Sequence, residues 1–281
     1  MNNLTIQFPA VILSTGQNVL KGIAESAAFA RLGEGTVTTQ NPTSGFLTTI
    51  FSDTQLEYCR GRFGQTCSRF ALASMFSHFE LGCSELLVYR RIFERFQNID
   101  GLLNGPEMWK LRKSAIEDVK RLPLEKVVVG QVLTKPSEHI LTLSVCLEGL
   151  RRIRNCIMHH AGRVTVDDIA YRRSIHEVKN TDKLEVQWLT ATLIVGGKEV
   201  EKFPFQVKDY LDEEGKLQMS VELNYTWDKS TREWGLGEEI VINEQECQNI
   251  GLTLSDLTQS VINECLPEYQ GIINNRKQRV K

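Results

Sequence analysis

Long apolar runs are missing from this sequence, and its first 20 residues carry no charged side chain. The only apolar run near the start covers residues 8–13, is interrupted by Pro9, and is far shorter than the roughly 20 apolar residues that a membrane span needs. The basic segment with which a secretory signal peptide begins is missing too. We therefore expect a cytoplasmic protein that makes no contact with a membrane.

Cysteine pairs at metal-binding or disulfide spacing are also missing. The chain has seven cysteines, an odd number, and they are scattered through apolar patterns without a regular CxxC pair. This usage is typical of reduced cysteines in the core of a cytosolic protein. They stand at positions 59, 67, 83, 146, 156, 247 and 265.

No loop of the kind that binds phosphate or calcium is present in the sequence. Gly196-Gly197 is interpreted as a turn, and the glycines of residues 234–237 lack the lysine and helix of a nucleotide-binding loop. The acidic residues 209–214 lack the alternating ligands and the glycine of a calcium loop. We therefore expect no nucleotide hydrolysis, no cofactor and no metal.

The charge is distributed unevenly along the 281 residues, although the net charge is only -2. Residues 151–173 hold six arginines and two aspartates, a balance of +4, whereas residues 182–246 hold seven basic and fifteen acidic residues, a balance of -8. A polyanion such as RNA is attracted to the first region and repelled by the second. Arg151, Arg152 and Arg163 are the candidate RNA-binding residues. The alternative is that these arginines only provide a solvated, polar helix face.

Helical spacing of apolar residues dominates the first 170 residues. It predicts a helix over residues 15–32, a loop over 33–45, and a long helical region that begins with a capping box formed by Ser52 and Gln55. The apolar stripe of this second region predicts a buried face, and it consists of Leu72, Met75, Phe76, Phe79, Cys83 and Leu86.

Two further helices are predicted before residue 162. One runs from Met108 to Leu122, and the other opens at Pro136 and Ser137, covers residues 137–161, and is followed by Gly162 as its C-terminal cap. In the second helix, Arg154 falls within about 20° of the apolar stripe that begins at Leu143, so an arginine occupies a position where an apolar residue is expected.

The pattern changes to alternating and β-branched residues at about residue 184. Strands are predicted at residues 184–195, 200–207, 217–227 and 239–243. Helical spacing returns over residues 253–266 and is followed by a basic tail, residues 276–281. The fold class expected from these patterns is α+β, mainly α, with a β-rich region at about residues 184–243 and a final helix.

The segment Arg154-Asn155-Cys156-Ile157-Met158-His159 joins side chains that suit RNA cleavage. Asn155 and His159 are four residues apart and therefore neighbours on one helix face, and His159 and His160 lie in the last turn. A guanidinium can hold two phosphate oxygens, and an imidazole transfers protons near neutral pH. Attack by the 2′-hydroxyl of RNA on the adjacent phosphate needs both functions and no metal.

This segment resembles the R-x4-H motif of HEPN ribonucleases in its R-N-x-x-x-H form, and the resemblance covers roughly residues 50–175. It implies a helical bundle, an endoribonuclease of the toxin or antiviral-defence type, a homodimer with two facing motifs, and restraint by an antitoxin or another defence partner. By motif matching, Arg154 would hold the scissile phosphate, His159 would transfer protons, and Asn155 would orient one of them. His160 is the alternative histidine, and Glu80 is a candidate for the acidic residue that some members place near the arginine.

The resemblance suggests a division of the chain into four parts. Residues 1–50 form an N-terminal helix and linker, and residues 51–180 form the HEPN-like bundle with the active-site helix 137–161. Residues 181–250 form a β-rich insertion or appendage, and residues 251–281 form the final helix with the basic tail.

Several other readings of these residues remain open. The trio Arg154, Asn155 and His159 could be structural, with the arginine paired to a core carboxylate. The chain could then be an inactive HEPN-like module with a binding or regulatory function. The acidic β-rich region would offer such a module a docking surface. An unrelated helical enzyme or scaffold is a third reading. Cys156 and His160 could share a zinc ion, although the spacing reveals no further ligands.

The remaining histidines are isolated and interpreted as structural or exposed: His78, His139 and His176.

Overall fold

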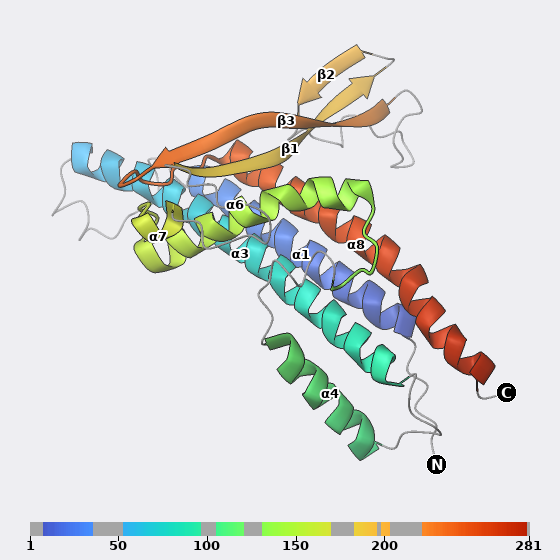
Figure 1. Cartoon of the computed structure of the whole chain (residues 1–281). Helices are drawn as coiled ribbons and strands as arrows, with labels where there is room; N and C mark the ends of the chain where they lie inside the picture. Colours follow the sequence, from blue (N-terminus) through green and yellow to red (C-terminus); the bar gives the residue numbers. More distant parts are fainter. Residues whose placement is uncertain are drawn as a thin grey trace. The chain divides into compact units, whose positions relative to one another are not determined.

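The computed structural model of the chain describes residues 8–35, 53–96, 105–120, 131–169, 183–195, 198–202 and 221–279 (Figure 1). Side-chain surroundings are described for residues 9–27, 62–96, 105–120, 131–169, 183–190 and 232–272. Long helices dominate these ranges and a single antiparallel sheet accompanies them. The expected class, α+β and mainly α, is confirmed. No helix in these ranges combines the length and the apolar character needed to cross a membrane.

The four helices expected before residue 162 are present. They are α1 (Phe8–Gly35), α3 (Asp53–Phe96), α4 (Gly105–Lys120) and α6 (Glu138–His160), and a short helix α7 (Val166–Ile169) follows. Ser137 caps α6 as predicted, because its Oγ accepts the amide hydrogen of Ile140 at 3.4 Å and its carbonyl accepts that of Leu141 at 3.0 Å. The predicted capping residue Ser52 lies outside the described residues.

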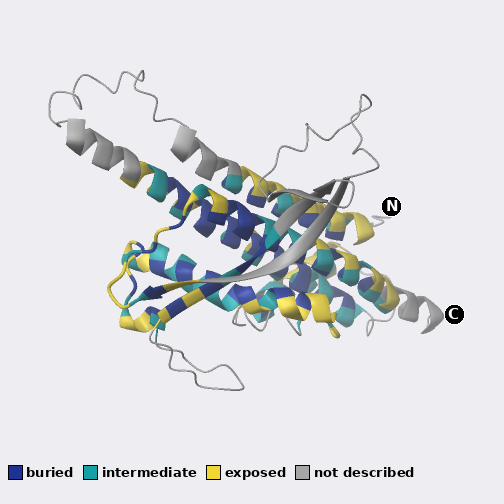
Figure 2. Cartoon of the chain, turned by 90° about the horizontal axis from the view of Figure 1, so that it is seen from above, coloured by how far each residue is buried: buried dark blue, intermediate teal, exposed yellow. Residues whose placement is uncertain are grey.

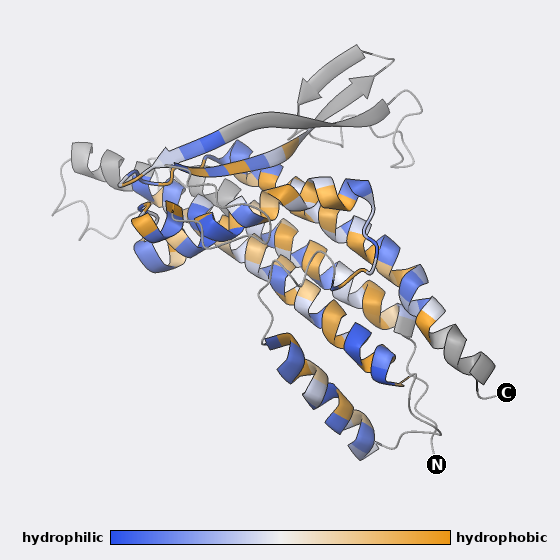
Figure 3. Cartoon of the chain, viewed as in Figure 1, coloured by the Kyte–Doolittle hydropathy of each residue, from blue (hydrophilic) through white to orange (hydrophobic). Residues whose placement is uncertain are grey.

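Apolar and polar positions alternate along the helices with the helical period, and buried positions recur with the same period (Figures 2 and 3). The six residues of the predicted stripe on α3 are all buried, with relative exposures of 0–3%. Side-chain surroundings are described for six of the seven cysteines, and each of these six is free and buried. The prediction of reduced core cysteines is confirmed for this part of the chain.

The chain divides into two compact units, and each is assembled from stretches that are separated in the sequence. The first unit comprises residues 1–22, 77–148 and 255–281, and the second comprises residues 23–76 and 149–254. Helices α1, α3, α6 and the last helix, α8 (Glu244–Arg279), therefore contribute segments to both units.

The first unit is held together by close contact between helices and by a buried tyrosine. A methyl group placed on Gly82 of α3 would lie 2.1 Å from Cγ2 of Val19 on α1, so glycine is needed for this approach. Tyr269 of α8 is 1% exposed, and its hydroxyl donates hydrogen bonds to the carbonyls of Leu86 and Val132 at 3.2 and 3.0 Å. The buried hydroxyl is thus satisfied by the backbone.

The sheet belongs to the second unit and has the strand order β2-β1-β3, antiparallel throughout. Its strands are β1 (Lys183–Val195), β2 (Lys198–Lys202) and β3 (Val221–Gly235). Strands β1, β2 and β3 correspond to three of the four predicted strands. Strand β3 extends beyond its predicted end to Gly235, and residues 203–220 lie outside the described residues.

The fourth predicted strand, residues 239–243, was wrong. Glu239 forms one isolated antiparallel bridge with Arg163, and the amide of Ile240 donates to the carbonyl of Gly162 at 2.7 Å.

The last helix begins earlier than the predicted residue 253. Asn243 and Glu246 form a reciprocal capping box, in which each side chain accepts the other residue's amide hydrogen, at 2.8 and 2.9 Å, and α8 starts at Glu244.

Helix α6 lies directly against strand β1 at Gly149. A methyl group on Gly149 would lie 2.4 Å from the carbonyl oxygen of Glu185 and 3.2 Å from Cα of Val186. Both atoms belong to the backbone of a paired strand, which cannot yield without disturbing the sheet. Glycine at this position therefore permits the close packing of the helix that carries the motif.

We expect Gly149→Ala to lower the free energy of unfolding by about 1–3 kcal/mol, the usual cost of overpacking. The matched control is Gly271→Ala in α8, where nothing lies within 4 Å of the added methyl group. That variant should gain up to about 1 kcal/mol from the higher helix propensity of alanine. Urea unfolding of the two variants and the wild type measures both changes, and equal effects of the two substitutions would contradict the close packing at Gly149.

Candidate functional site

The second half of α6 has two chemically different sides. Ile153 and Cys156 are fully buried, with relative exposures of 0%, whereas Met158 is 61% exposed. Arg154 and Ile157 are half-buried. In this half of the helix the buried positions are therefore Ile153 and Cys156, and not the continuation of the apolar stripe that was predicted from Leu143. The arginine lies beside the core and does not occupy a core position.

The outer face, which we define as Arg154, Asn155, Met158 and His159, carries the predicted catalytic residues. Nη1 of Arg154 donates a hydrogen bond of 2.8 Å to Oδ1 of Asn155. This bond restricts the guanidinium of a long, flexible side chain, and the two residues are half-buried. The asparagine holds the guanidinium of Arg154, and its expected role of orienting a catalytic group stays a prediction.

His159 is exposed on the outer face, four residues after Asn155. Residues four apart are neighbours on a helix, so the imidazole lies next to the Arg154–Asn155 pair. The structure records no hydrogen bond or ion pair between His159 and another described residue. Its imidazole is accessible to a ligand that approaches the end of α6.

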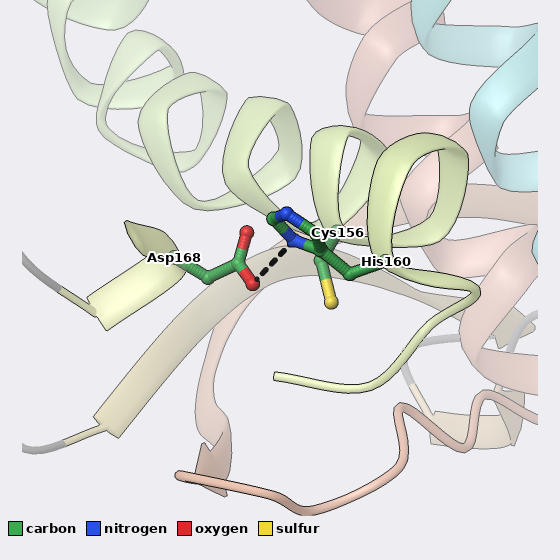
Figure 4. Close-up of side chains that lie close together, drawn as sticks. All are labelled: Cys156, His160 and Asp168. Atoms are coloured by element: carbon green, nitrogen blue, oxygen red, sulfur yellow. Dashed lines mark hydrogen bonds and ion pairs between the residues drawn. The ribbon is translucent and has the colours of Figure 1, made fainter. Parts of the chain in front are cut away.

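His160, the next residue, is directed inward and is fixed by a carboxylate. Nδ1 of His160 lies 2.9 Å from Oδ2 of Asp168, the interaction that the dashed line in Figure 4 marks. The same nitrogen lies 3.3 Å from Oγ1 of Thr165. The side chain of Asp168 is 4% exposed and that of His160 is 31% exposed. The two adjacent histidines thus differ in accessibility and in partners, which the sequence did not reveal.

Cys156 lies one turn before His160 and faces the same carboxylate. Burial, and secondarily the charge of Asp168 and a hydrogen bond with it, raise the pKa of the Cys156 thiol to about 12. The thiol is therefore protonated at neutral pH in the metal-free protein and is a poor nucleophile. Thiol-based catalysis is not what this arrangement favours. We call Cys156, His160 and Asp168 the inner cluster.

Two hydrogen bonds from Thr165 position the carboxylate of the inner cluster. Oδ2 of Asp168 accepts hydrogen bonds from the amide and from Oγ1 of Thr165, both at 2.8 Å, at the start of α7. Arg152 holds the other end of this short helix, because its Nη2 donates to the carbonyls of Asp168 and, at 2.8 Å, Ile169. Sequence reasoning missed Asp168 and Thr165, although the Thr-x-x-Asp spacing was a usable signal.

The turn after α6 returns the chain towards the inner cluster. Ala161 and Gly162 both adopt left-handed backbone conformations, with φ of 52° and 77°. The amide of Gly162 donates to the carbonyl of Cys156 at 3.1 Å, so the predicted capping role of this glycine is confirmed. Alanine at position 161 is strained in this region, because its Cβ crowds the backbone there.

Residues 162–164 are anchored to residues 237–240, and the latter segment is anchored to α3. The amide of Val164 donates to the carbonyl of Glu238 at 2.9 Å. Arg69 of α3 donates from Nε to the carbonyl of Ile240 and from Nη2 to Glu239, both at 2.7 Å. The Arg69 guanidinium, followed by that of Arg62, lowers the pKa of the Glu239 carboxyl, which stays ionised in this network.

The three arginines expected to bind RNA differ in their surroundings. Arg163 is exposed and donates to the carbonyl of Gly237 at 3.3 Å, and Arg151 is half-buried. Arg152 is engaged with the end of α7. Arg163 is therefore the most accessible of the three for a phosphate, and the RNA-binding role of all three stays a prediction.

The other candidate residues lie in the first unit or outside the described residues. Glu80 is half-buried on α3, and its proposed role beside the arginine stays a prediction. His78 is exposed and its ring lies against Gly22, and His139 is exposed with Nε2 at 3.0 Å from Oδ2 of Asp256. His176 lies outside the described residues.

No protein-family model matches this chain, and neither a curated protein nor a solved structure matches it.

Proposed function

We propose that this chain is a metal-independent endoribonuclease of the HEPN type, in which the outer face of α6 cleaves RNA through the substrate's own 2′-hydroxyl. The observation that carries the proposal is the 2.8 Å hydrogen bond between Arg154 and Asn155 beside the exposed His159. These residues provide a positioned cation and an accessible proton-transfer group within two turns of one helix.

Each residue of the outer face has a defined task in this reaction. The guanidinium of Arg154 holds the non-bridging oxygens of the scissile phosphate and stabilises the negative charge that grows on them. His159 transfers a proton at the 2′-oxygen or at the 5′-oxygen leaving group. Asn155 limits the rotation of the arginine, so less conformational entropy is lost when the phosphate binds.

The resemblance of the motif to HEPN proteins adds a second copy of the chain. In the proposed enzyme two outer faces meet across a homodimer, and the exposed Met158, 61% accessible, supplies apolar surface for the contact. The basic region around Arg163 attracts the RNA backbone. Biologically, we place such an enzyme in toxin or antiviral defence systems, with a partner protein that restrains it.

The direct test uses the purified full-length chain and total cellular RNA in the presence of EDTA. We expect cleavage with 2′,3′-cyclic phosphate ends, because the 2′-oxygen attacks the phosphate. A synthetic RNA with a single 2′-deoxy nucleotide at the mapped cleavage site, and a DNA of the same sequence, should stay intact. Cleavage of the DNA, or the absence of any RNA cleavage together with normal growth on expression, would overturn the proposal.

A binding or regulatory module is the second candidate function. The -8 balance of residues 182–246 favours it, since an acidic region is suited to a basic protein partner and not to RNA. This candidate predicts salt-sensitive RNA binding without cleavage, or co-purification with a basic partner, in the same experiments.

A further inference from the structure

The inner cluster joins three kinds of metal-binding side chain from two helices. Sγ of Cys156, a ring nitrogen of His160 and a carboxylate oxygen of Asp168 all lie within 4.8 Å of one another (Figure 4). Cys156 and His160 come from consecutive turns of α6, and Asp168 comes from α7. We propose that Cys156, His160 and Asp168 bind a zinc ion.

The ligands are oriented before any metal arrives. A spacing of four residues places Cys156 and His160 side by side on α6, and the two hydrogen bonds from Thr165 fix the carboxylate of Asp168 opposite them. Zinc sites need such outer hydrogen bonds, because these orient the coordinating atoms. Thr165 is therefore a positioning residue of the proposed site.

Burial also favours a metal here. Cys156 is 0% exposed and Asp168 is 5% exposed, so the site is shielded on the side of the protein core. A thiolate and a carboxylate together carry two negative charges, which a divalent cation neutralises. A buried site with no net charge costs far less than a buried carboxylate and thiolate alone.

The ligand set selects zinc over the common hard cations. Magnesium and calcium prefer oxygen ligands, whereas zinc accepts one sulfur, one nitrogen and one oxygen in a tetrahedral arrangement. Water supplies the fourth ligand and enters past the partly exposed His160. On binding, the thiol releases its proton to solvent, and His160 coordinates through Nδ1 while its proton resides on Nε2.

The zinc ion ties the end of α6 to α7 and stabilises the fold of the second unit. The inference does not rest on the proposed ribonuclease activity, because zinc would bind the inner cluster and RNA would bind the outer face. Its tests measure metal binding and stability, so either proposal can fail while the other stands.

The experiment begins with the full-length chain stripped of metal by a chelator and dialysed. Addition of zinc should load one ion per chain, measured by competition with a chromophoric chelator, and should raise the melting temperature. Addition of cobalt(II) should give the visible absorption of a tetrahedral site together with a thiolate-to-metal charge-transfer band.

Variants locate the site. Cys156→Ala, His160→Gln and Asp168→Asn should lose zinc binding and the cobalt charge-transfer band, and Thr165→Val should weaken zinc binding by about 10- to 100-fold. The matched control is Cys146→Ala, which removes another buried thiol from the same helix and should keep both signals. A wild-type chain without a thiolate–cobalt band, or a Cys156→Ala chain that keeps it, overturns the proposal.

Discussion

Replacing Arg154 by alanine is expected to lower the rate of RNA cleavage by about 100- to 1,000-fold, the usual effect of removing one group that stabilises transition-state charge. The guanidinium is the outer-face cation that Asn155 positions, through the 2.8 Å bond. Lysine at position 154 should restore only part of the rate, because an ammonium ion keeps the charge but loses the planar fork that matches a phosphate. Single-turnover cleavage of a labelled RNA measures the three rates.

The matched control for this variant is Arg112→Ala, which removes an exposed arginine from α4 in the first unit. It changes the net charge by the same amount and should leave the rate unchanged. Thermal melting of each variant separates a loss of chemistry from a loss of fold, since Arg154 is half-buried and packs beside the core. Wild-type rates in Arg154→Ala would remove the arginine from the mechanism.

Substitution of His159 by alanine should reduce the cleavage rate by roughly 100- to 10,000-fold, the range observed for removal of a general acid or base. Its side chain is exposed, so its removal disturbs little packing and the melting temperature should stay within the error of the wild type. The expected signature is a large fall in rate with an unchanged fold and unchanged RNA binding. Cleavage assays and filter binding on the same preparations measure both.

His139→Ala is the control for this second variant, because it removes an exposed histidine from the same helix, outside the motif. Its rate should equal that of the wild type. The adjacent His160 provides the sharper comparison. If His160→Gln abolishes cleavage in EDTA while His159→Ala does not, the proton-transfer group is His160 and the assignment of His159 fails.

The two histidines show why a motif alone does not assign roles. Both stand in the last turn of α6, five and six residues after Arg154. In the structure, His159 is accessible and His160 bonds to the buried Asp168. The accessible residue is suited to a substrate, and the anchored one is suited to a structural link or a metal.

Helix positions were predictable because local signals agree with the tertiary packing. The stripe on α3 is buried as its spacing predicts, and Ser137 and Gly162 bound α6 through capping that depends only on neighbouring residues. The strand predicted at residues 239–243 failed because the backbone of Ile240 bonds to Arg69 of α3 and to Gly162 in the turn after α6, and Glu239 forms only an isolated bridge. The early start of α8 was missed because Asn243, which caps the helix, was assigned to that strand.

The sequence by itself determined the helices, the three strands that are located, the absence of a cysteine framework, and the cluster of Arg154, Asn155 and His159. These features depend on residues that are close together in the chain, where hydrogen-bonding and apolar periodicities are visible. Tertiary structure alone decided that Asp168 reaches Cys156 and His160, that Arg152 secures α7, and that glycine is required where α6 meets β1. Each of these contacts joins residues that are eight or more positions apart and are brought together by a turn or by the packing of a helix on a strand, which the spacing of apolar residues does not specify.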